Sequence, residues 1–214
     1  MSRAYIPKTI WKKVKSKYLL DLASVKVGSP EDFSNFMNAV IDKKAFESIT
    51  QYIKYAEKAS DAEIISGGTF DDKKGYFISP TTILTKNPHF KTMEEEIFGP
   101  VLTIYLYDPS TWTQTLELID STSPYALTGC VMGKNENAIK EATDHLKHSA
   151  GNFYINDKPT GAVVGQQPFG GSRASGTNDK AGSELNLQRW ISVRTIKETY
   201  DTPKDYRYPF LGEQ

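Results

Sequence analysis

The stretch from residue 101 to residue 156 alternates between apolar segments of strand length and segments with a helical pattern. Residues 101–107, 127–132 and 152–156 are the predicted strands, and residues 110–120 and 135–148 are the predicted helices. The first strand is apolar almost throughout, which is typical of a strand covered on both faces. Asn135 stands at the expected N-cap of the second helix, and Gly151 lies past its end. Strands and helices in this order predict parallel α/β units, so the expected fold class is α/β.

A shorter set of elements precedes this stretch. Residues 42–60 predict a helix, because apolar side chains at helical spacing fall on one face: Ala45, Phe46, Ile49, Tyr52, Ile53 and Ala56. Residues 62–66 predict a strand that ends at Gly67 and Gly68. A turn at residues 71–75 leads to two further β-rich segments, 76–78 and 82–84.

The first twenty residues contain no acidic residue, but they contain Arg3 and five lysines. Such a segment is compatible with an organelle transit peptide, although transit peptides favour arginine and serine over lysine. We favour an ordinary first helix, in which Pro7 occupies the first helical position. Its apolar stripe would consist of Ile10, Val14, Tyr18 and Leu22.

The charge balance and the cysteine content argue against several classes of function. The chain has 214 residues, with 26 Lys and Arg against 26 Asp and Glu, so no net charge would attract nucleic acid or an anionic membrane. No apolar run reaches the roughly 18 residues that a membrane-spanning helix needs. A single cysteine excludes an internal disulfide and a multi-cysteine metal site, and it suits a reducing compartment.

Residues 161–182 form a segment of unusual composition. They contain six glycines, at positions 161, 165, 170, 171, 176 and 182, and they show no helical or strand period. Glycine allows positive φ angles and close backbone approach, and a structureless loop of this length is usually either functional or disordered. The apolar residues Val163, Val164 and Phe169 favour order. We therefore predict an ordered loop whose backbone N–H groups approach a ligand, beyond the carboxyl end of the strand at 152–156.

Few side chains could carry out chemistry by themselves. Cys130, the only thiol, lies in the predicted apolar strand, which favours a structural role over a nucleophilic one. Glu141, His145 and His148 share one helix face, where a metal site is conceivable but a solvated helix end is the stronger interpretation. No Gly-x-Gly-x-x-Gly segment follows a strand, and residues 176–183 do not place their lysine where a phosphate-binding loop has it, so no dinucleotide-binding half is encoded.

An acidic run, Glu94, Glu95 and Glu96, leads directly into an apolar strand. Such runs are usually solvated. A carboxylate beside an aromatic residue at the entrance of a strand could instead hold a ribose hydroxyl and pack a ring. The residues alone do not decide between these two interpretations.

Two segments resemble the NAD-dependent aldehyde dehydrogenase superfamily. Residues 95–101, Glu-Glu-Ile-Phe-Gly-Pro-Val, resemble its E-E-x-F-G-P segment, and residues 168–171 resemble its P-F-G-G segment. The longer segment 160–182 is more specific. It resembles the substrate-anchoring loop of those members that oxidise L-glutamate γ-semialdehyde to L-glutamate with NAD in proline catabolism, in the mitochondrial matrix of eukaryotes. The resemblance extends from Ser2 to the end of the chain.

This resemblance implies roles for five residues. Glu96 would hydrogen-bond the nicotinamide ribose of the cofactor NAD, and Phe98 would pack near the nicotinamide. Gly161 and Ala162 would offer backbone N–H groups to the α-carboxylate of the small-molecule substrate. Phe169 would pack along the aliphatic chain of the substrate. A glycine-dense loop suits this task, because backbone amides recognise anions well.

The resemblance also implies an aldehyde-dehydrogenase-like catalytic domain, a parallel-strand α/β sheet with flanking helices, here without the Rossmann cofactor domain. Residues 1–172 would be the C-terminal portion of that domain, 173–190 a connecting segment, 191–200 a subunit-pairing strand and 201–214 a tail. Intact members would be homo-oligomers with dimer-type pairing. The N-terminal helix would match an internal part of the family, so we expect no targeting sequence in this chain.

In the family, the catalytic cysteine, the general-base glutamate and the oxyanion-hole asparagine lie before the segment that matches residues 2–5. We therefore expect the chain to be the C-terminal part of such an enzyme, with no catalytic residue of its own, and to be inactive alone. Cys130 matches none of the catalytic positions. Two alternatives stay open: a non-catalytic subunit that pairs with the full-length enzyme, and a module that binds small carboxylates.

Overall fold

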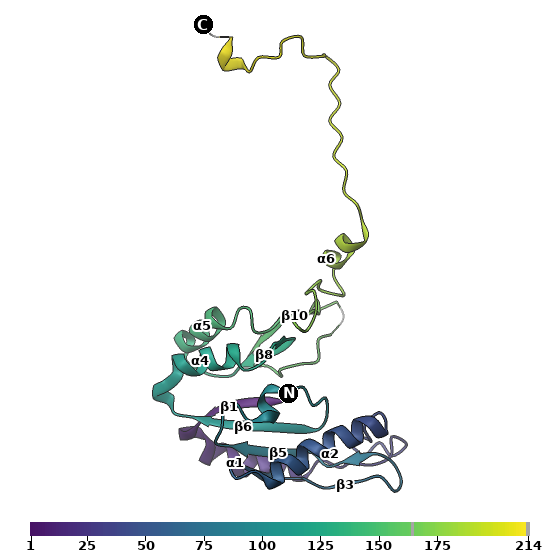
Figure 1. The fold of residues 1–214 in the computed structure, drawn as a ribbon, viewed down its shortest axis with the longest axis vertical. Helices are drawn as coiled ribbons and strands as arrows, with labels where there is room; N and C mark the ends of the chain where they lie inside the picture. Colours follow the sequence, from purple (N-terminus) through teal and green to yellow (C-terminus); the bar gives the residue numbers. More distant parts are fainter. Residues whose placement is uncertain (164, 213–214) are drawn as a thin grey trace.

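Four strands form the main sheet, in the order β1 (Arg3–Pro7), β6 (Val101–Tyr107), β5 (Thr81–Thr85) and β2 (Ala62–Ser66). β1 and β5 run parallel to β6, whereas β2 is antiparallel to β5. The computed structural model describes residues 1–163 and 165–212; Val164 of the glycine-rich segment and the last two residues of the predicted tail lie outside the described residues. In Figure 1 the main sheet lies in the lower part of the molecule, with α1 and α2 beside it.

Helix α2 (Lys43–Lys58) confirms the helix predicted from the apolar face. The side chain of its N-cap, Asp42, accepts a hydrogen bond from the backbone N–H of Ala45 at 2.7 Å. The helix buries Phe46, Ile49, Ile53 and Ala56. These side chains pack with Ile83 of β5 and Val101 of β6 in the main core, where each large apolar side chain contributes about 1.5–3 kcal/mol to folding.

Helix α1 (Lys8–Ala23) differs from the prediction in its start and in its packing. Pro7 is the last residue of β1 and the N-cap of α1, so it does not occupy the first helical position, and β1 itself was not predicted. Trp11 is the buried residue of this helix, while Ile10 and Val14 of the predicted stripe are 45% and 41% exposed. The reason is geometric: α1 packs through Trp11 and Tyr18, and the hydroxyl of Tyr18 bonds Thr82 of β5, whereas Ile10 and Val14 line an open cleft.

The segment between β2 and β6 contains a small hairpin and one helical turn. β3 (Phe70–Asp71) pairs antiparallel with β4 (Phe77–Ile78) across the predicted turn, where Asp71 accepts a hydrogen bond from the N–H of Lys73. α3 (Lys91–Glu94) follows β5 and brings the acidic run to the start of β6.

A second unit contains α4 (Trp112–Ser121), β7 (Tyr125–Ala126), β8 (Thr128–Val131), α5 (Glu136–His145) and β9 (Asn152–Ile155). β8, α5 and β9 form a parallel β-α-β unit, as predicted, and the side chain of Asn135 caps α5 by accepting from the N–H groups of Asn137 and Ala138. β6 has β1 and β5 on its two edges, so β8 and β9 form a separate sheet.

The glycine-rich segment is ordered in its described residues, as predicted, and it also contains strand structure. β10 (Ser172–Arg173) pairs antiparallel with β7. Phe169 and Ala181 exchange two backbone hydrogen bonds of 2.8 Å, which close the segment between them into a compact loop.

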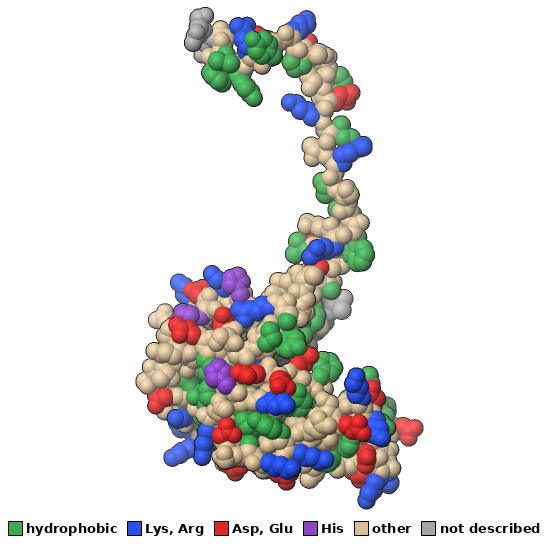
Figure 2. Space-filling view, viewed as in Figure 1, with side chains coloured by type: hydrophobic (Ala, Val, Ile, Leu, Met, Phe, Trp, Pro, Cys, Tyr) green, Lys and Arg blue, Asp and Glu red, His purple; other side chains and the backbone are tan. Residues whose placement is uncertain are grey.

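The residues after Trp190 form an extended arm, which leaves the rest of the molecule, here called the body, after α6 (Glu184–Leu187) and the 3₁₀ turn at Gln188–Trp190 (Figure 1). Within the described residues of this arm, the predicted pairing segment 191–200 takes part in no strand pairing, and its apolar side chains stand exposed (Figure 2). Its predicted partner is another subunit, so the single chain leaves that prediction open. Among the described residues, no helix has the length and apolar character to cross a bilayer.

Candidate functional site

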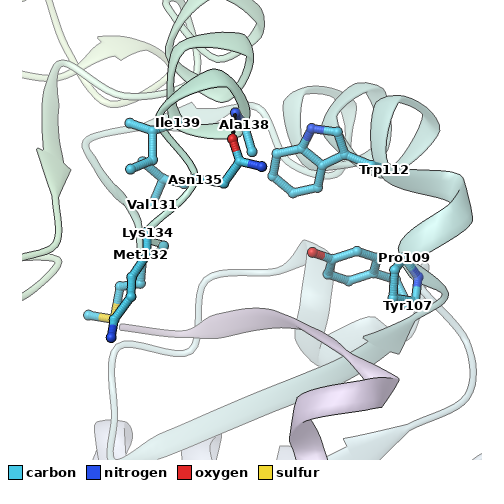
Figure 3. A pocket seen from close by; sticks show the side chains of 10 residues that line it. Tyr107, Pro109, Trp112, Val131, Met132, Lys134, Asn135, Ala138 and Ile139 are labelled. Atoms are coloured by element: carbon cyan, nitrogen blue, oxygen red, sulfur yellow. Dashed lines mark hydrogen bonds between the residues drawn. The ribbon is translucent and has the colours of Figure 1, made fainter.

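The carboxyl ends of β6 and β8 open onto one pocket of about 460 Å³. Figure 3 shows Tyr107 and Trp112 on one side of it and Met132, Lys134 and Asn135 on the other. Because both strands end at this pocket, β6 and β8 point in the same direction. The amino ends of β1, β6 and β8 therefore lie together at the opposite end of the molecule.

Glu96 and Phe98 lie at this amino-terminal end, just before β6. Ile97 between them is buried, whereas Phe98 is 91% exposed with φ of 55°. Gly99, the next residue, packs closely on the core: a Cβ there would lie 2.6 Å from Cδ1 of Ile49. This close approach helps to fix the backbone at Phe98. A bulky residue with positive φ is strained, so the backbone holds the ring of Phe98 out toward solvent at some cost.

The neighbours of Glu96 in the acidic run are engaged. Glu94 pairs with His89 Nδ1 at 2.8 Å, and Glu95 accepts a hydrogen bond of 2.6 Å from the hydroxyl of Tyr52. This hydrogen bond, together with partial burial, raises the pKa of Tyr52 to about 12. Glu96 is exposed and has no hydrogen-bond partner among the described residues. The run is thus not a uniformly solvated cluster: it leaves one free carboxylate next to an exposed aromatic ring.

The loop that carries Phe169 returns to the amino ends of the strands. Asn152, the first residue of β9, donates from Nδ2 to the carbonyl of Pro168 at 3.0 Å and accepts at Oδ1 from the N–H of Gly170 at 3.1 Å. The expectation that the loop acts beyond the carboxyl end of β9 is therefore wrong for this part of it. The loop starts at that end, but Asn152 clamps its Pro-Phe-Gly part at the opposite end.

Gly161 and Ala162 lie between the end of β9 and this clamp. Gly161 has φ of 88°, and a Cβ at this position would meet no atom within 4 Å. The N–H groups of both residues have no acceptor among the described residues, whereas the next N–H, of Val163, donates to Oε1 of Gln167 at 3.0 Å. Two consecutive backbone donors without an acceptor in the described part of the chain suit the binding of a carboxylate.

The five residues named from the sequence thus fall into two groups. Glu96, Phe98 and Phe169 lie at the amino-terminal end of the parallel strands, and Arg3 ties β1 to this end by donating to the carbonyl of Met93 at 3.1 Å. Gly161 and Ala162 belong to the connection that leads there. A free carboxylate and an exposed ring fit the ribose and the nicotinamide of NAD, so these residues are compatible with that cofactor. The reasoning from sequence missed Asn152, although a polar residue directly after Gly151 at a strand entrance is a usable signal.

Cys130 and Glu141 have structural partners. The thiol of Cys130 donates to the carbonyl of Asp157 at 2.9 Å, and burial, the largest influence, raises its pKa. The thiol is half-buried and lines a cleft. Glu141 accepts hydrogen bonds from Nε1 of Trp112 and from Oγ1 of Thr113, both at 3.0 Å. Because both of its carboxylate oxygens have these partners, Glu141 is not free to bind a metal ion together with the two histidines. The described residues contain no His, Cys, Asp and Glu cluster suited to a metal ion.

Comparison with known proteins gives consistent matches. A family model described as the aldehyde dehydrogenase family matches residues 1–196. The mitochondrial delta-1-pyrroline-5-carboxylate dehydrogenase of Dictyostelium discoideum is 58% identical over 98% of this chain and 38% of its own length. The enzyme of the same name from Homo sapiens is 46% identical, again over 98% of this chain and 38% of its own length.

Solved structures agree. The crystal structure of the delta-pyrroline-5-carboxylate dehydrogenase from Mycobacterium tuberculosis aligns with a TM-score of 0.85 and 44% identity, over 99% of this chain and 39% of that one. A structure of the same enzyme bound with NAD aligns with a TM-score of 0.84. The chain therefore spans 38% of the length of the curated relatives named here.

Proposed function

The chain belongs to the aldehyde dehydrogenase family, and we propose that its 214 residues form the substrate-anchoring part of a delta-1-pyrroline-5-carboxylate dehydrogenase. Such an enzyme would oxidise L-glutamate γ-semialdehyde, the open form of pyrroline-5-carboxylate, to L-glutamate with NAD. The observation that carries this proposal is the pair of N–H groups at Gly161 and Ala162, which have no acceptor among the residues that the structure describes. Relatives named mitochondrial support a location in the mitochondrial matrix.

The anchoring role follows from the geometry of the loop. Gly161 has a positive φ and open space around its Cα, and its N–H and that of Ala162 have no acceptor among the described residues, so an α-carboxylate would accept both hydrogen bonds. Phe169, held in place through the bridge to Ala181, would cover the aliphatic part of the substrate. Hydrogen bonds to a charged group contribute about 1.5–3 kcal/mol each. Two such bonds would fix the α-carboxylate and so orient the reacting aldehyde at the other end of the substrate.

Two residues would hold NAD. The free carboxylate of Glu96 would accept hydrogen bonds from the nicotinamide ribose, and the exposed ring of Phe98 would pack near the nicotinamide. When bound, NAD supplies the hydride acceptor for the oxidation.

The only cysteine of the chain, Cys130, is not activated as a nucleophile. A nucleophilic cysteine needs a lowered pKa, and burial raises the pKa of Cys130 while its thiol donates to the carbonyl of Asp157. We therefore expect the 214 residues, assayed alone with pyrroline-5-carboxylate and NAD, to produce no NADH above background. Turnover at the rate of an intact enzyme would contradict this assignment.

The anchor is tested by NMR titration of the chain with L-glutamate. The amide signals of Gly161 and Ala162 should shift with added glutamate, and Ala162→Pro, which removes one N–H, should weaken binding about tenfold or more. Ala162→Ser keeps the N–H and is the matched control, so it should bind as the unchanged chain does. If glutamate leaves both amide signals unchanged, the anchor is wrong.

A second function is favoured by the exposed arm. A non-catalytic subunit would pair through residues 191–200 with a full-length enzyme, and the exposed Val193 and Ile196 support such pairing. Co-purification with the intact enzyme, lost on deletion of these residues, distinguishes this function. Binding of glutamate without any association would instead indicate a free-standing carboxylate-binding module.

A further inference from the structure

Lys180, near the end of the glycine-rich segment, is a half-buried lysine that makes no ion pair in the described part of the chain. Its ammonium donates instead to two backbone carbonyl groups, that of Gly151 at 2.5 Å and that of Gly170 at 3.4 Å. Burial lowers the pKa of Lys180, because a charged group is less stable away from water. A lysine is usually exposed or paired with a carboxylate, since burying an unpaired cation costs free energy.

The two carbonyl groups belong to segments that lie far apart in the sequence. Gly151 directly precedes β9, and Gly170 directly follows Phe169 in the glycine-rich segment. Hydrogen bonds from a charged donor are stronger than those between neutral groups. The ammonium of Lys180 therefore ties the loop to the start of β9, at the residue next to Phe169.

The backbone beside Lys180 holds Phe169 as well. Phe169 exchanges two backbone hydrogen bonds of 2.8 Å with Ala181, the residue that follows Lys180. A Cβ on Gly170 would lie 3.0 Å from the backbone nitrogen of Lys180, so the two chains also pack closely. Phe169 is thus held by the main chain and by the side chain of one dipeptide, Lys180–Ala181.

The backbone around Lys180 is strained. Asn178 and Lys180 have φ of 59° and 57°, in the left-handed region that residues other than glycine seldom adopt. Asp179 between them accepts hydrogen bonds from Oγ1 of Thr177 and, at 2.7 Å, from Nε of Arg189. Such strain persists only where the surrounding contacts over-determine the backbone, and it is concentrated at functional sites.

We propose that Lys180 is a positioning residue that sets the chain-length preference of the substrate site, by holding Phe169 against the aliphatic part of the substrate. This role rests on the proposed function. The α-carboxylate is assigned to the N–H groups of Gly161 and Ala162, which the ammonium of Lys180 does not contact. Loss of Lys180 should therefore weaken the grip on the aliphatic chain and leave the grip on the carboxylate unchanged.

Two ligands separate these two parts of the site. Glycine and L-norvaline both carry an α-carboxylate, but only norvaline has an aliphatic chain, with as many carbon atoms as glutamate. Each methylene group buried against an apolar wall strengthens binding about fourfold. The 214-residue chain should therefore bind norvaline at least about tenfold more tightly than glycine, measured by NMR titration of the amide signals of Gly161 and Ala162.

Lys180→Met keeps an unbranched side chain but has no hydrogen-bond donor. It should lower the affinity for norvaline about fivefold or more and leave the affinity for glycine unchanged. Lys147→Met is the matched control, because it removes an exposed lysine four residues before Gly151. Both affinities should stay unchanged in this control.

Restoring an ammonium at position 180 should restore the preference. Lys180→Cys is combined with Cys130→Ala, so that the chain has one thiol, and this thiol is then aminoethylated. The modified side chain carries its amine at the same distance from the backbone as lysine does. The aminoethylated chain should regain the preference for norvaline that the Cys130→Ala chain shows, whereas the unmodified thiol should not.

A double-mutant cycle separates positioning from a general loss of loop structure. Phe169→Ala should itself remove the preference for norvaline. Adding Lys180→Met to Phe169→Ala should then cause no further loss, because the effects of two residues that act through one another are not additive.

Three results would overturn this role of Lys180: an unchanged ratio of norvaline to glycine affinity in Lys180→Met, equal losses for both ligands, or additive losses in the double variant. Equal losses would mean that Lys180 supports the whole loop or binds the carboxylate itself. In each case binding of both ligands by the unchanged chain would leave the proposed function standing. If the unchanged chain binds neither ligand, the proposed function is wrong and the role of Lys180 falls with it.

Discussion

At the scale of single residues, the side chain of Asn152 and a close backbone approach at Gly151 hold the glycine-rich loop on the rest of the molecule. Asn152 bonds the loop on both sides of Phe169, and Gly151 beside it allows the chains to touch: a Cβ there would lie 1.9 Å from the carbonyl oxygen of Gly170. Only glycine permits this approach. The loop geometry therefore depends on a residue outside the glycine-rich segment.

Gly151→Ala should detach this part of the loop. The added methyl group collides with backbone, so we expect a loss of about 1–3 kcal/mol in unfolding free energy, measured in urea, and faster proteolysis within residues 161–182. Gly133→Ala is the control, because its nearest neighbour is Cγ1 of Ile139 at 3.9 Å. Equal stability of the two variants would show that the loop does not pack as described.

Tyr52 reports on the acidic run beside Glu96. Its hydrogen bond to Glu95 raises its pKa to about 12, so the neutral hydroxyl is favoured in the folded state. The resulting stabilisation is complete below the ordinary tyrosine pKa of about 10 and is lost as the pH rises through about 12. A difference absorbance titration against Tyr52→Phe should show this late ionisation, and Glu95→Gln should bring it toward the ordinary value. Ionisation of Tyr52 at an ordinary pKa would contradict the contact.

At the scale of elements, an ion pair joins β10 to the end of α4. Arg173 bonds the carboxylate and the backbone carbonyl of Asp120, each at 2.6 Å, and Ser149 donates to the same carboxylate. Burial acts to raise the pKa of Asp120, but the hydrogen bonds from Ser149 and Arg173 outweigh it, so the pKa is lowered. Three segments distant in the sequence meet at this one carboxylate.

Asp120→Asn should reduce stability in a pH-dependent way. A lowered folded-state pKa means that the carboxylate stabilises the fold above its ordinary pKa of about 4 and loses this contribution as the pH falls further. We expect a deficit of about 1 kcal/mol in unfolding free energy at neutral pH, since the pair is partly exposed, and a smaller deficit in acid. Asp21→Asn removes the more exposed pair with Lys17 and should change stability by less than about 0.5 kcal/mol. A deficit independent of pH would rule out the ion pair as its cause.

At the scale of the whole molecule, the apolar core that stabilises the fold lies in the body, and the arm takes no part in it. The core lies around α2 and β5–β6, with a smaller cluster around Leu116, Ala142 and Leu146. The segment after Trp190 contributes no residue to either cluster and extends away from both (Figure 1).

Removal of the arm should leave the body intact. Limited proteolysis should cut first between residues 191 and 208, and the remaining body should melt within about 2 °C of the full chain, because no buried apolar contact is lost. Melting curves of the full chain and of a chain ending at Trp190 provide the measurement. A drop well beyond this range would show that the arm folds back on the body in solution.

Local pattern in the sequence determined most of the elements themselves, although not β1. The apolar face of α2, the near-continuous apolar run of β6 and the Asn135 cap of α5 are properties of neighbouring residues, and helical and strand periods are read over a few turns or pleats. The same is true of the glycine-rich segment and of Glu96 and Phe98, which identified the family. Tertiary structure alone decided how strands pair: β1 takes the edge of β6, so β8 starts a second sheet, the loop folds back to the amino ends, and a pocket forms where β6 and β8 end. Pairing joins residues about a hundred positions apart, such as Arg3 and Thr103, and no local period encodes which edge a strand will find.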